Sequence, residues 1–103
     1  MSPILIRVLA VDDEPELGAL TKAFLEMPGD IKVDNSTSVS EARYALSEKR
    51  YDAIVSDYQM PGEDGIQFLR TLRGTGDHTP FILFTGKGRE EVVIEALNNG
   101  ADS

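Results

Sequence analysis

Three aspartates and one threonine of this 103-residue chain stand directly after apolar runs, where their side chains could act together. Asp12-Asp13 follows one run, Asp57 follows another, and Thr85 follows a third. Each alone is typical of a helix cap or a turn. Together they supply carboxylate oxygens for a hard divalent cation and a hydroxyl donor for an anion. The pattern therefore predicts a cation site centred on Asp57, provided that the fold brings these runs side by side.

Repulsion between the carboxylates explains why such a group needs a cation. Two carboxylates about 5 Å apart repel by roughly 3 kcal/mol at an effective dielectric of ~20. Three of them therefore either raise their pKa values or hold a positive ion. Oxygen ligands without a nearby His or Cys favour Mg²⁺, and the single histidine, His78, is expected in an exposed loop. A carboxylate in such a site can also accept a phosphoryl group covalently.

The segments around these residues predict alternating strands and helices. Short apolar runs indicate strands, and apolar residues at every third or fourth position indicate helices. Strands are predicted over residues 4–11, 31–35, 52–56 and 81–84, and a polar loop over 73–79. Four helices are predicted: one from Pro15 with Leu17, Leu20 and Phe24 on one side; one capped by Ser38 or Ser40 with Val39, Ala42, Ala45 and Leu46 on one side; one with Ile66, Leu69 and Leu72 inward; and one over 90–98.

This alternation predicts the fold class and the place of the site. Strand–helix–strand units give a doubly wound parallel sheet with helices on both faces. Ligands of such sheets bind beyond the carboxyl ends of the strands, where the predicted site residues stand.

Composition restricts the class of protein. A hydrophobic content of 41% predicts one globular domain over residues 1–103. The net charge of −8 and the scattered basic residues argue against direct nucleic-acid binding. The chain has no cysteine, no apolar run of about 20 residues and no signal-peptide pattern, so we expect a cytoplasmic protein without a membrane segment.

The acidic residues lie in motifs that resemble those of response-regulator receiver domains. Three stretches carry the resemblance: Val11-Asp12-Asp13-Glu14-Pro15 is similar to the acidic pair, Asp57-Tyr58-Gln59-Met60-Pro61 with Asp64-Gly65 is similar to the acceptor loop D-x-x-M-P-x-x-D-G, and Phe84-Thr85-Gly86 is similar to the switch threonine or serine with its small neighbour. The resemblance covers the whole chain. It implies the flavodoxin-like strand order 2-1-3-4-5.

The resemblance also implies a role for each site residue. Asp57 is expected to accept a phosphoryl group from a histidine kinase or phosphotransfer protein, after which the domain switches conformation to control an output. Asp13, Asp57 and the backbone carbonyl of Gln59 would ligate Mg²⁺, with Asp12 acting through water or as a secondary ligand. Thr85 would move towards the phosphoryl group. The chain is then a signalling domain rather than an enzyme, apart from catalysing its own phosphoryl transfer and dephosphorylation.

The chain departs from the family pattern at its C-terminus. Receivers carry a lysine at the end of a fifth strand and an aromatic switch residue within it, and that strand and the fifth helix are absent before Ser103. Lys87 is interpreted as a solvated turn residue rather than a replacement. We therefore expect an incomplete receiver with slower or weaker phosphorylation. We also expect self-association through the exposed strand 81–84 or the fourth helix.

Three other functions are compatible with parts of the sequence. An interaction domain that binds partners without phosphorylation is the main alternative, because the lysine is missing. A small hydrolase that uses Asp57 as its nucleophile ranks last, because the haloacid-dehalogenase-type pattern has a second aspartate where Gln59 stands. A flavin-binding domain of the same fold is disfavoured, since an acidic first loop would repel a phosphate.

Overall fold

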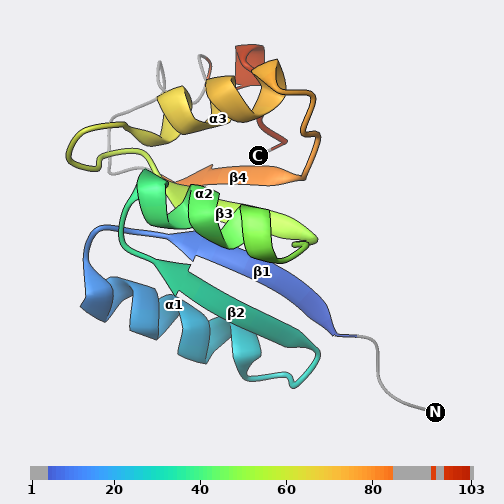
Figure 1. Ribbon diagram of the computed structural model, residues 1–103. Coiled ribbons are helices and arrows are strands. Elements are labelled where there is room, and N and C mark those ends of the chain that lie inside the picture. The colour runs from blue at the N-terminus through green and yellow to red at the C-terminus, as the bar shows by residue number, and fades with distance from the viewer. Residues whose placement is uncertain (1–4, 85–93, 95–96, 103) are drawn as a thin grey trace.

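Strands and helices alternate along the chain, as the sequence predicts (Figure 1). The structure is a computed structural model that describes residues 5–84, 94 and 97–102. The elements in chain order are β1 (Ile6–Val11), α1 (Pro15–Glu26), β2 (Ile31–Ser36), α2 (Val39–Glu48), β3 (Ala53–Asp57), α3 (Gly65–Gly74) and β4 (Phe81–Phe84).

The strands form one parallel sheet in the order β2-β1-β3-β4, which confirms the predicted order for the part of the chain described. Val11 at the end of β1 is in register with Ser36 of β2 and Ser56 of β3. Asp57 is in register with Phe84, the last residue of β4. This register places the carboxyl ends of all the strands at the same end of the sheet. The sequence predicts the site at this end.

Helices pack on both faces of the sheet. On one face, α2 and α3 cover the larger core, which includes Leu9, Ile54, Phe68 and Phe81, all 0% exposed. The rings of Phe68 and Phe81 meet edge to face with centroids 5.8 Å apart. On the other face, α1 covers a smaller core. Its fully or nearly fully buried members are Val8, Ala10 and Val33.

The predicted helix starts are confirmed where the structure describes them. Pro15 is the first residue of α1, where its missing N–H costs no hydrogen bond. Of the two candidate caps for α2, Ser38 is the cap, because its hydroxyl accepts the N–H of Glu41 at 3.1 Å. The stripe that faces the core from α2 is also the predicted one, with Val39 and Ala42 buried.

The apolar residues of α1 lie largely at the surface. Leu17, Leu20 and Phe24 have helical spacing, but they are 45%, 66% and 68% exposed. Only Gly18 of this helix is buried, because α1 packs over β2 and β1 and leaves the β3–β4 part of that face uncovered by described residues. An apolar groove runs between α1 and those strands. It is lined by Leu20, Thr21, Phe24, Leu25, Val55, Ile82 and Phe84.

The two edges of the sheet differ. At the β2 edge, the carboxylate of Glu26 accepts the N–H of Val33 at 2.7 Å, so a side chain occupies a position that another strand would need. At the β4 edge, Asp102 donates its N–H to the carbonyl of Phe81 and accepts the N–H of Phe81 on its carboxylate, both at 2.9 Å. Beyond Phe81 the strand carries the exposed Ile82 and Phe84.

Part of the predicted C-terminal region lies outside the described residues. Of the helix predicted over 90–98, residues 94, 97 and 98 are helical, and the others fall outside the description. Gly100 has φ +97°, and its N–H bonds to the carbonyl of Leu97 at 3.1 Å, as expected for the predicted C-cap. Thr85 and Lys87 also lie outside the described residues.

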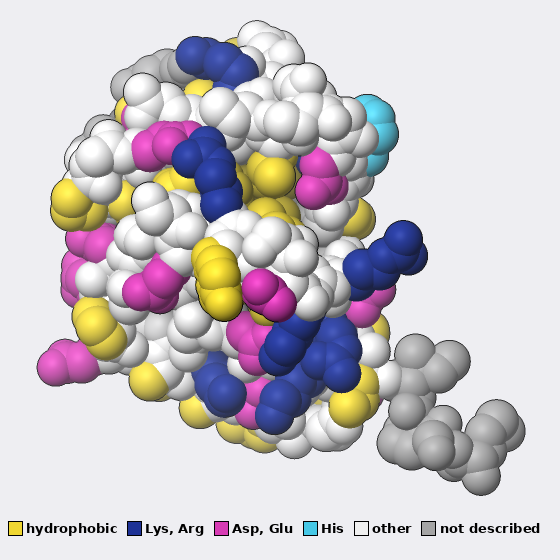
Figure 2. Space-filling model, in the orientation of Figure 1, with side chains coloured by type: hydrophobic (Ala, Val, Ile, Leu, Met, Phe, Trp, Pro, Cys, Tyr) yellow, Lys and Arg dark blue, Asp and Glu magenta, His cyan; other side chains and the backbone are white. Residues whose placement is uncertain are grey.

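Charged side chains of both signs share the surface. On the face drawn in Figure 2, the basic side chains lie in several places with acidic ones beside them. His78 is exposed, as predicted. Within the described ranges, no helix has the length and apolar character needed to cross a bilayer. The cytoplasmic location stays a prediction.

Arg73 shows that the predicted loop over 73–79 began too early. The helix α3 continues to Gly74, and the Arg73 side chain is only 17% exposed. Its guanidinium donates to the carbonyls of Asp77, Thr79 and Gly100 at 2.9 to 3.0 Å. It also donates to the Asp102 carboxylate at 3.4 Å. One side chain thus connects α3, the segment that leads into β4, and the residues beside the β4 edge.

Replacing Arg73 should therefore cost more than a surface arginine normally does. We expect Arg73→Met to lower the free energy of unfolding by roughly 2–3 kcal/mol, because several carbonyl oxygens lose their donor. Arg70→Met removes an exposed arginine from the same helix and should cost less than half as much. Denaturant unfolding followed by circular dichroism measures both. Equal losses would contradict the connecting role of Arg73.

Candidate functional site

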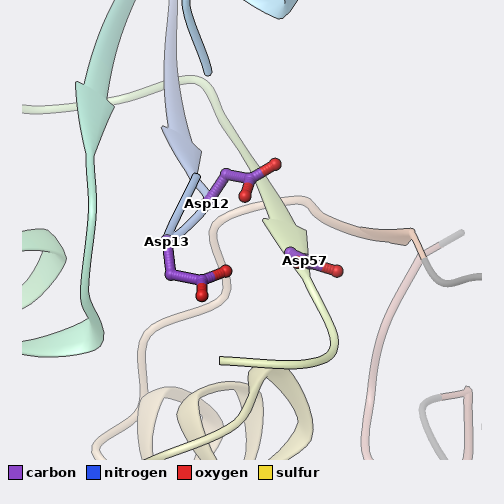
Figure 3. A group of neighbouring side chains, drawn as sticks. All are labelled: Asp12, Asp13 and Asp57. Carbon is purple, nitrogen blue, oxygen red and sulfur yellow. The ribbon is translucent and has the colours of Figure 1, made fainter. Parts of the chain in front are cut away.

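Three carboxylates converge at the carboxyl ends of β1 and β3. One ligating oxygen each from Asp12, Asp13 and Asp57 lies within 4.8 Å of the others. Figure 3 shows Asp12 and Asp13 directly after β1 and Asp57 at the end of β3, with the side chains at the same edge of the sheet. Asp12 is 5% exposed, and the other two are half-buried. The structure thus brings together the three acids that the sequence predicted.

Backbone contacts fix the first pair. The N–H of Asp12 donates to the carbonyl of Ser36 at 3.0 Å and so extends the β1–β2 ladder by one residue. One carboxylate oxygen of Asp12 accepts the N–H of Glu14 at 2.9 Å, at the start of α1. Asp12 is therefore partly the turn residue that its position alone would suggest. Its second oxygen keeps acceptor capacity for a cation or a water.

A close contact with α3 fixes Asp57. The N–H of Tyr58 donates to the carbonyl of Phe84 at 3.0 Å, and the N–H of Gly65 donates to the carbonyl of Tyr58 at 2.9 Å. A Cβ at Gly65 would overlap the carbonyl oxygen of Asp57 and lie 2.8 Å from Leu83 Cδ1. Glycine is therefore needed at this position for α3 to start directly against Asp57.

Burial and charge both disfavour ionisation of Asp57. Desolvation raises the pKa of the Asp57 carboxyl above its ordinary value, and the negative charges of Asp12 and Asp13 raise it further. The backbone N–H groups of Gln59 and Tyr58 act in the opposite direction and stabilise the carboxylate. The net shift is upward, so the ionised cluster is a centre of unfavourable energy that a cation would relieve.

The donor set fits a hard divalent cation. Among the described residues, these aspartates are the one group of acidic or histidine side chains close enough to share a metal ion. Carboxylates with open access to water suit Mg²⁺, which keeps several waters in its shell. Gln59 and Asp13 line the same open hollow, so the loop that carries Gln59 borders the carboxylates. The position of Thr85 relative to these groups is not described.

Two features of the site escaped prediction from the sequence. Arg43 on α2 forms a bidentate ion pair with Glu63 in the loop after β3. The two residues are 20 positions apart, so no local sequence pattern predicts that they pair. The contact of Gly65 with the Asp57 carbonyl was also not foreseen. The motif placed Gly65 in the acceptor loop, but it gave no reason for the absence of a side chain.

The raised pKa predicts how stability depends on pH. A carboxyl whose pKa is higher in the folded than in the unfolded state favours folding at low pH, and this contribution is lost as pH rises through the folded pKa. Without Mg²⁺, Asp57→Asn should therefore raise the free energy of unfolding at pH 7 by about 1 kcal/mol, the Coulomb repulsion being reduced by solvent.

The gain should shrink as pH falls towards 3.8, the ordinary pKa of an Asp carboxyl. Asp30→Asn removes the same charge from an exposed turn at the opposite end of the sheet and serves as the control. Thermal unfolding at several pH values measures both variants. If Asp57→Asn stabilises no more than Asp30→Asn at pH 7, then repulsion in the cluster is not the cause.

Known proteins are similar to this chain in sequence and in fold. The family model described as "Response regulator receiver domain" matches residues 8–103. The response regulator Rre1 of Synechocystis sp. is 36% identical over 100 residues, which are 95% of this chain and 43% of that protein. The transcriptional regulatory protein ResD of Bacillus subtilis is 34% identical over 96 residues, or 93% of this chain and 39% of that protein. The chain thus spans about two fifths of the length of these relatives.

Solved structures agree with the sequence relatives. The receiver domain of the Francisella response regulator 1452 superposes with a TM-score of 0.87 at 32% identity, covering 95% of this chain and 80% of that one. The chemotaxis protein CheY4 of Vibrio cholerae gives a TM-score of 0.85 at 28% identity, covering 94% of this chain and 82% of that one. With the matched region, the parallel sheet and the acidic cluster in agreement, the chain belongs to the response regulator receiver domain family.

Proposed function

We propose that this domain accepts a phosphoryl group on Asp57 from a histidine kinase or phosphotransfer protein in a Mg²⁺-dependent reaction. The observation that carries the proposal is the convergence of three carboxylates within 4.8 Å at the ends of β1 and β3. A structural role does not account for this arrangement, because the group is held together against its own repulsion. Membership of the receiver family supports the same reaction.

The proposed ligands of Mg²⁺ are the carboxylates of Asp13 and Asp57 and the backbone carbonyl of Gln59. Asp12 would act through a water or as a secondary ligand, in keeping with the hydrogen bond that one of its oxygens already accepts from Glu14. When bound, the ion supplies positive charge against the phosphoryl oxygens and against the cluster itself. That charge would favour the ionised form of the Asp57 carboxyl, which is the nucleophile.

The chemical step is an in-line transfer to a carboxylate oxygen. An Asp57 oxygen attacks phosphorus, forming an O–P bond as the P–N bond to the donor histidine breaks. The electron pair of that P–N bond returns to the imidazole nitrogen of the donor. Hydrolysis of the resulting acyl phosphate by water regenerates Asp57 and releases inorganic phosphate. The domain catalyses only these reactions of its own side chain, so it is a signalling module rather than an enzyme acting on free substrates.

Thr85 is proposed to complete the response. Its hydroxyl would donate to a phosphoryl oxygen and move towards it, which couples phosphorylation to a change of conformation and to an output. Thr85 follows Phe84 directly, and Phe84 is tied by its carbonyl to the N–H of Tyr58, next to the acceptor. The end of β4 is therefore hydrogen-bonded to the residue that follows the proposed acceptor, Asp57.

An interaction domain that works without phosphorylation is the second candidate. It is favoured by the apolar groove beside α1, a surface of the kind that protein partners cover. An interaction domain of this kind does not explain why three carboxylates lie together. We therefore rank it below phosphoryl acceptance. The hydrolase ranks last for the reason given above, that Gln59 stands where a second aspartate is needed.

Phosphoryl acceptance is tested with small-molecule donors. With Mg²⁺ and acetyl phosphate, we expect intact-protein mass spectrometry to show the gain of one phosphoryl group. With Mg²⁺ and beryllium fluoride, we expect a protein-bound fluorine NMR signal. Both should disappear in Asp57→Ala and after chelation of the metal. Asp52→Ala, which removes an exposed aspartate directly before β3, is the matched control and should keep both signals.

Failure of the wild type to give either signal would favour the interaction domain. A signal that persists in Asp57→Ala would move the acceptor to another residue. Binding of Mg²⁺ is measured separately by calorimetry. Its absence at millimolar Mg²⁺ would contradict the metal site itself.

We also propose that the 103-residue chain associates with itself through the β4 edge. Asp102 pairs with Phe81 at the start of this strand, and the exposed Ile82 and Phe84 follow. These two side chains also line the apolar groove with Leu20 and Phe24 of α1. Strand pairing at this edge would bring the apolar grooves of two copies close together. Backbone hydrogen bonds and apolar side-chain contacts would then both stabilise the pair.

Ile82→Lys should weaken this association, because it places a charge at the exposed edge. Multi-angle light scattering over a concentration series should show the wild type above the monomer mass and Ile82→Lys closer to it. Lys32→Glu, which alters an exposed residue on the opposite edge strand, should behave like the wild type. A monomeric wild type at high concentration would contradict the proposal.

A further inference from the structure

The loop between β3 and α3, residues 58–64, is held on its outer side by an ion pair that the proposed reaction does not use. Arg43 on α2 donates from both terminal guanidinium nitrogens to the Glu63 carboxylate, at 2.8 and 2.5 Å. Two parallel bonds fix orientation as well as distance, unlike most surface pairs. The same guanidinium donates to the Thr71 hydroxyl at 2.7 Å. At Arg43, α2, the loop and α3 therefore meet.

The helix α3 orients this arginine. The guanidinium carbon of Arg43 lies 6.0 Å from the centroid of the Phe68 ring, which is fully buried. The Thr71 hydroxyl donates to the carbonyl of Phe68 at 2.9 Å, so its own position is fixed and its lone pair is directed at Arg43. Two contacts on α3 thus hold the fork of the guanidinium in place for Glu63.

Glu63 anchors the exposed part of the loop. Before it, Met60 is buried in the core, and after it, Asp64 forms a capping box at the start of α3. Between them, Pro61 and Gly62 are exposed, and Gly62 has φ +80°. Of the contacts described for this stretch, the bidentate pair of Glu63 is the one that ties it to a neighbouring helix.

The anchored stretch borders the carboxylate cluster. Gln59, Pro61 and Gly62 line the hollow that Asp13 also lines, whereas Glu63 lines a second hollow on the α3 side, with Thr71. We call the contacts of Arg43 with Glu63 and Thr71 the clamp. The loop thus lies between the clamp and the proposed metal site. A shift of this loop would move the backbone of Gln59 relative to the aspartates.

We propose that Arg43 is a positioning residue: through Glu63 it holds the loop so that the Gln59 carbonyl stays at metal-binding distance from Asp13 and Asp57. Arg43 then sets the Mg²⁺ affinity of the site without contacting the ion. This inference rests on the proposed function, because it assigns Arg43 a part in the same Mg²⁺-dependent reaction.

The test separates metal affinity from the chemical step. In Arg43→Ala, the Mg²⁺ concentration for half-maximal phosphorylation by acetyl phosphate should rise about 3- to 10-fold, less than the roughly 10- to 100-fold typical of residues that contact a metal ligand directly. At saturating Mg²⁺ the rate should stay within about twofold of the wild type, because the ligands themselves are intact. Calorimetry should show the same loss of Mg²⁺ affinity.

Two further variants control for charge and for folding. Arg50→Ala removes an exposed arginine between α2 and β3, at the far end of the sheet, and should leave the Mg²⁺ dependence unchanged. Thr71→Val keeps the shape of the side chain but removes one acceptor of Arg43, and should shift the Mg²⁺ dependence in the same direction by a smaller factor. Equal shifts in Arg43→Ala and Arg50→Ala would overturn the proposal, as would an unchanged Mg²⁺ dependence in Arg43→Ala.

A readout without metal distinguishes this inference from the proposed function. If the wild type neither binds Mg²⁺ nor takes up phosphate, the proposed function fails, and the Mg²⁺ role of Arg43 fails with it. The clamp itself is then tested by hydrogen exchange of the Gly65 N–H, which bonds to the Tyr58 carbonyl at the base of the loop. Faster exchange in Arg43→Ala than in Arg50→Ala supports the clamp, and equal exchange overturns it.

Discussion

Repulsion among three carboxylates is the constraint on which the rest of the structure depends. A parallel sheet with Val11 in register with Ser56 brings the ends of β1 and β3 together, and with them Asp12, Asp13 and Asp57. The covalent chain keeps Asp12 beside Asp13, but it does not keep Asp57 near them. The energy comes from the packed sheet, whose central strands contribute the fully buried Leu9 and Ile54. The core thus stabilises the site, and the site in turn destabilises the fold when its charges are unbalanced.

The residues around Asp57 fix the position of its carboxylate and of the loop after it, but they do not neutralise the charge of the cluster. The N–H groups of Tyr58 and Gln59 partly stabilise the carboxylate, yet the net pKa shift is upward. Gly65 lets α3 begin against the Asp57 carbonyl, and the Glu63–Arg43 pair ties the intervening loop to α2. Such fixed but uncompensated charge is preorganised for a cation, because little reorganisation is needed when the cation arrives.

Much of this arrangement was predictable, because the signals were local. Strands followed from short β-branched runs, and the cap of α2 followed from a serine before a helical stripe. The site followed from acids at strand ends, once a parallel sheet was expected. Two kinds of feature were not predictable. Spacing on α1 identified a helix but could not say that Leu20 and Phe24 stay exposed, since exposure depends on which elements cover the sheet. The pairing of Arg43 with Glu63 depends on how α2 and the loop meet in space.

The unequal edges of the sheet limit what kind of assembly the domain can form. Glu26 occupies the N–H of Val33 in the middle of β2, so that strand is a poor template for another chain. At the β4 edge Asp102 occupies the N–H and the carbonyl of Phe81, so any strand pairing there is limited to the residues beyond Phe81. Two copies joined edge to edge would be related by a twofold axis, and the joined sheet would then end on both sides in a blocked β2 strand. If two copies joined through β4, the carboxylate of Glu26 would disfavour the addition of a further copy at β2, so a closed pair would be preferred to a growing filament.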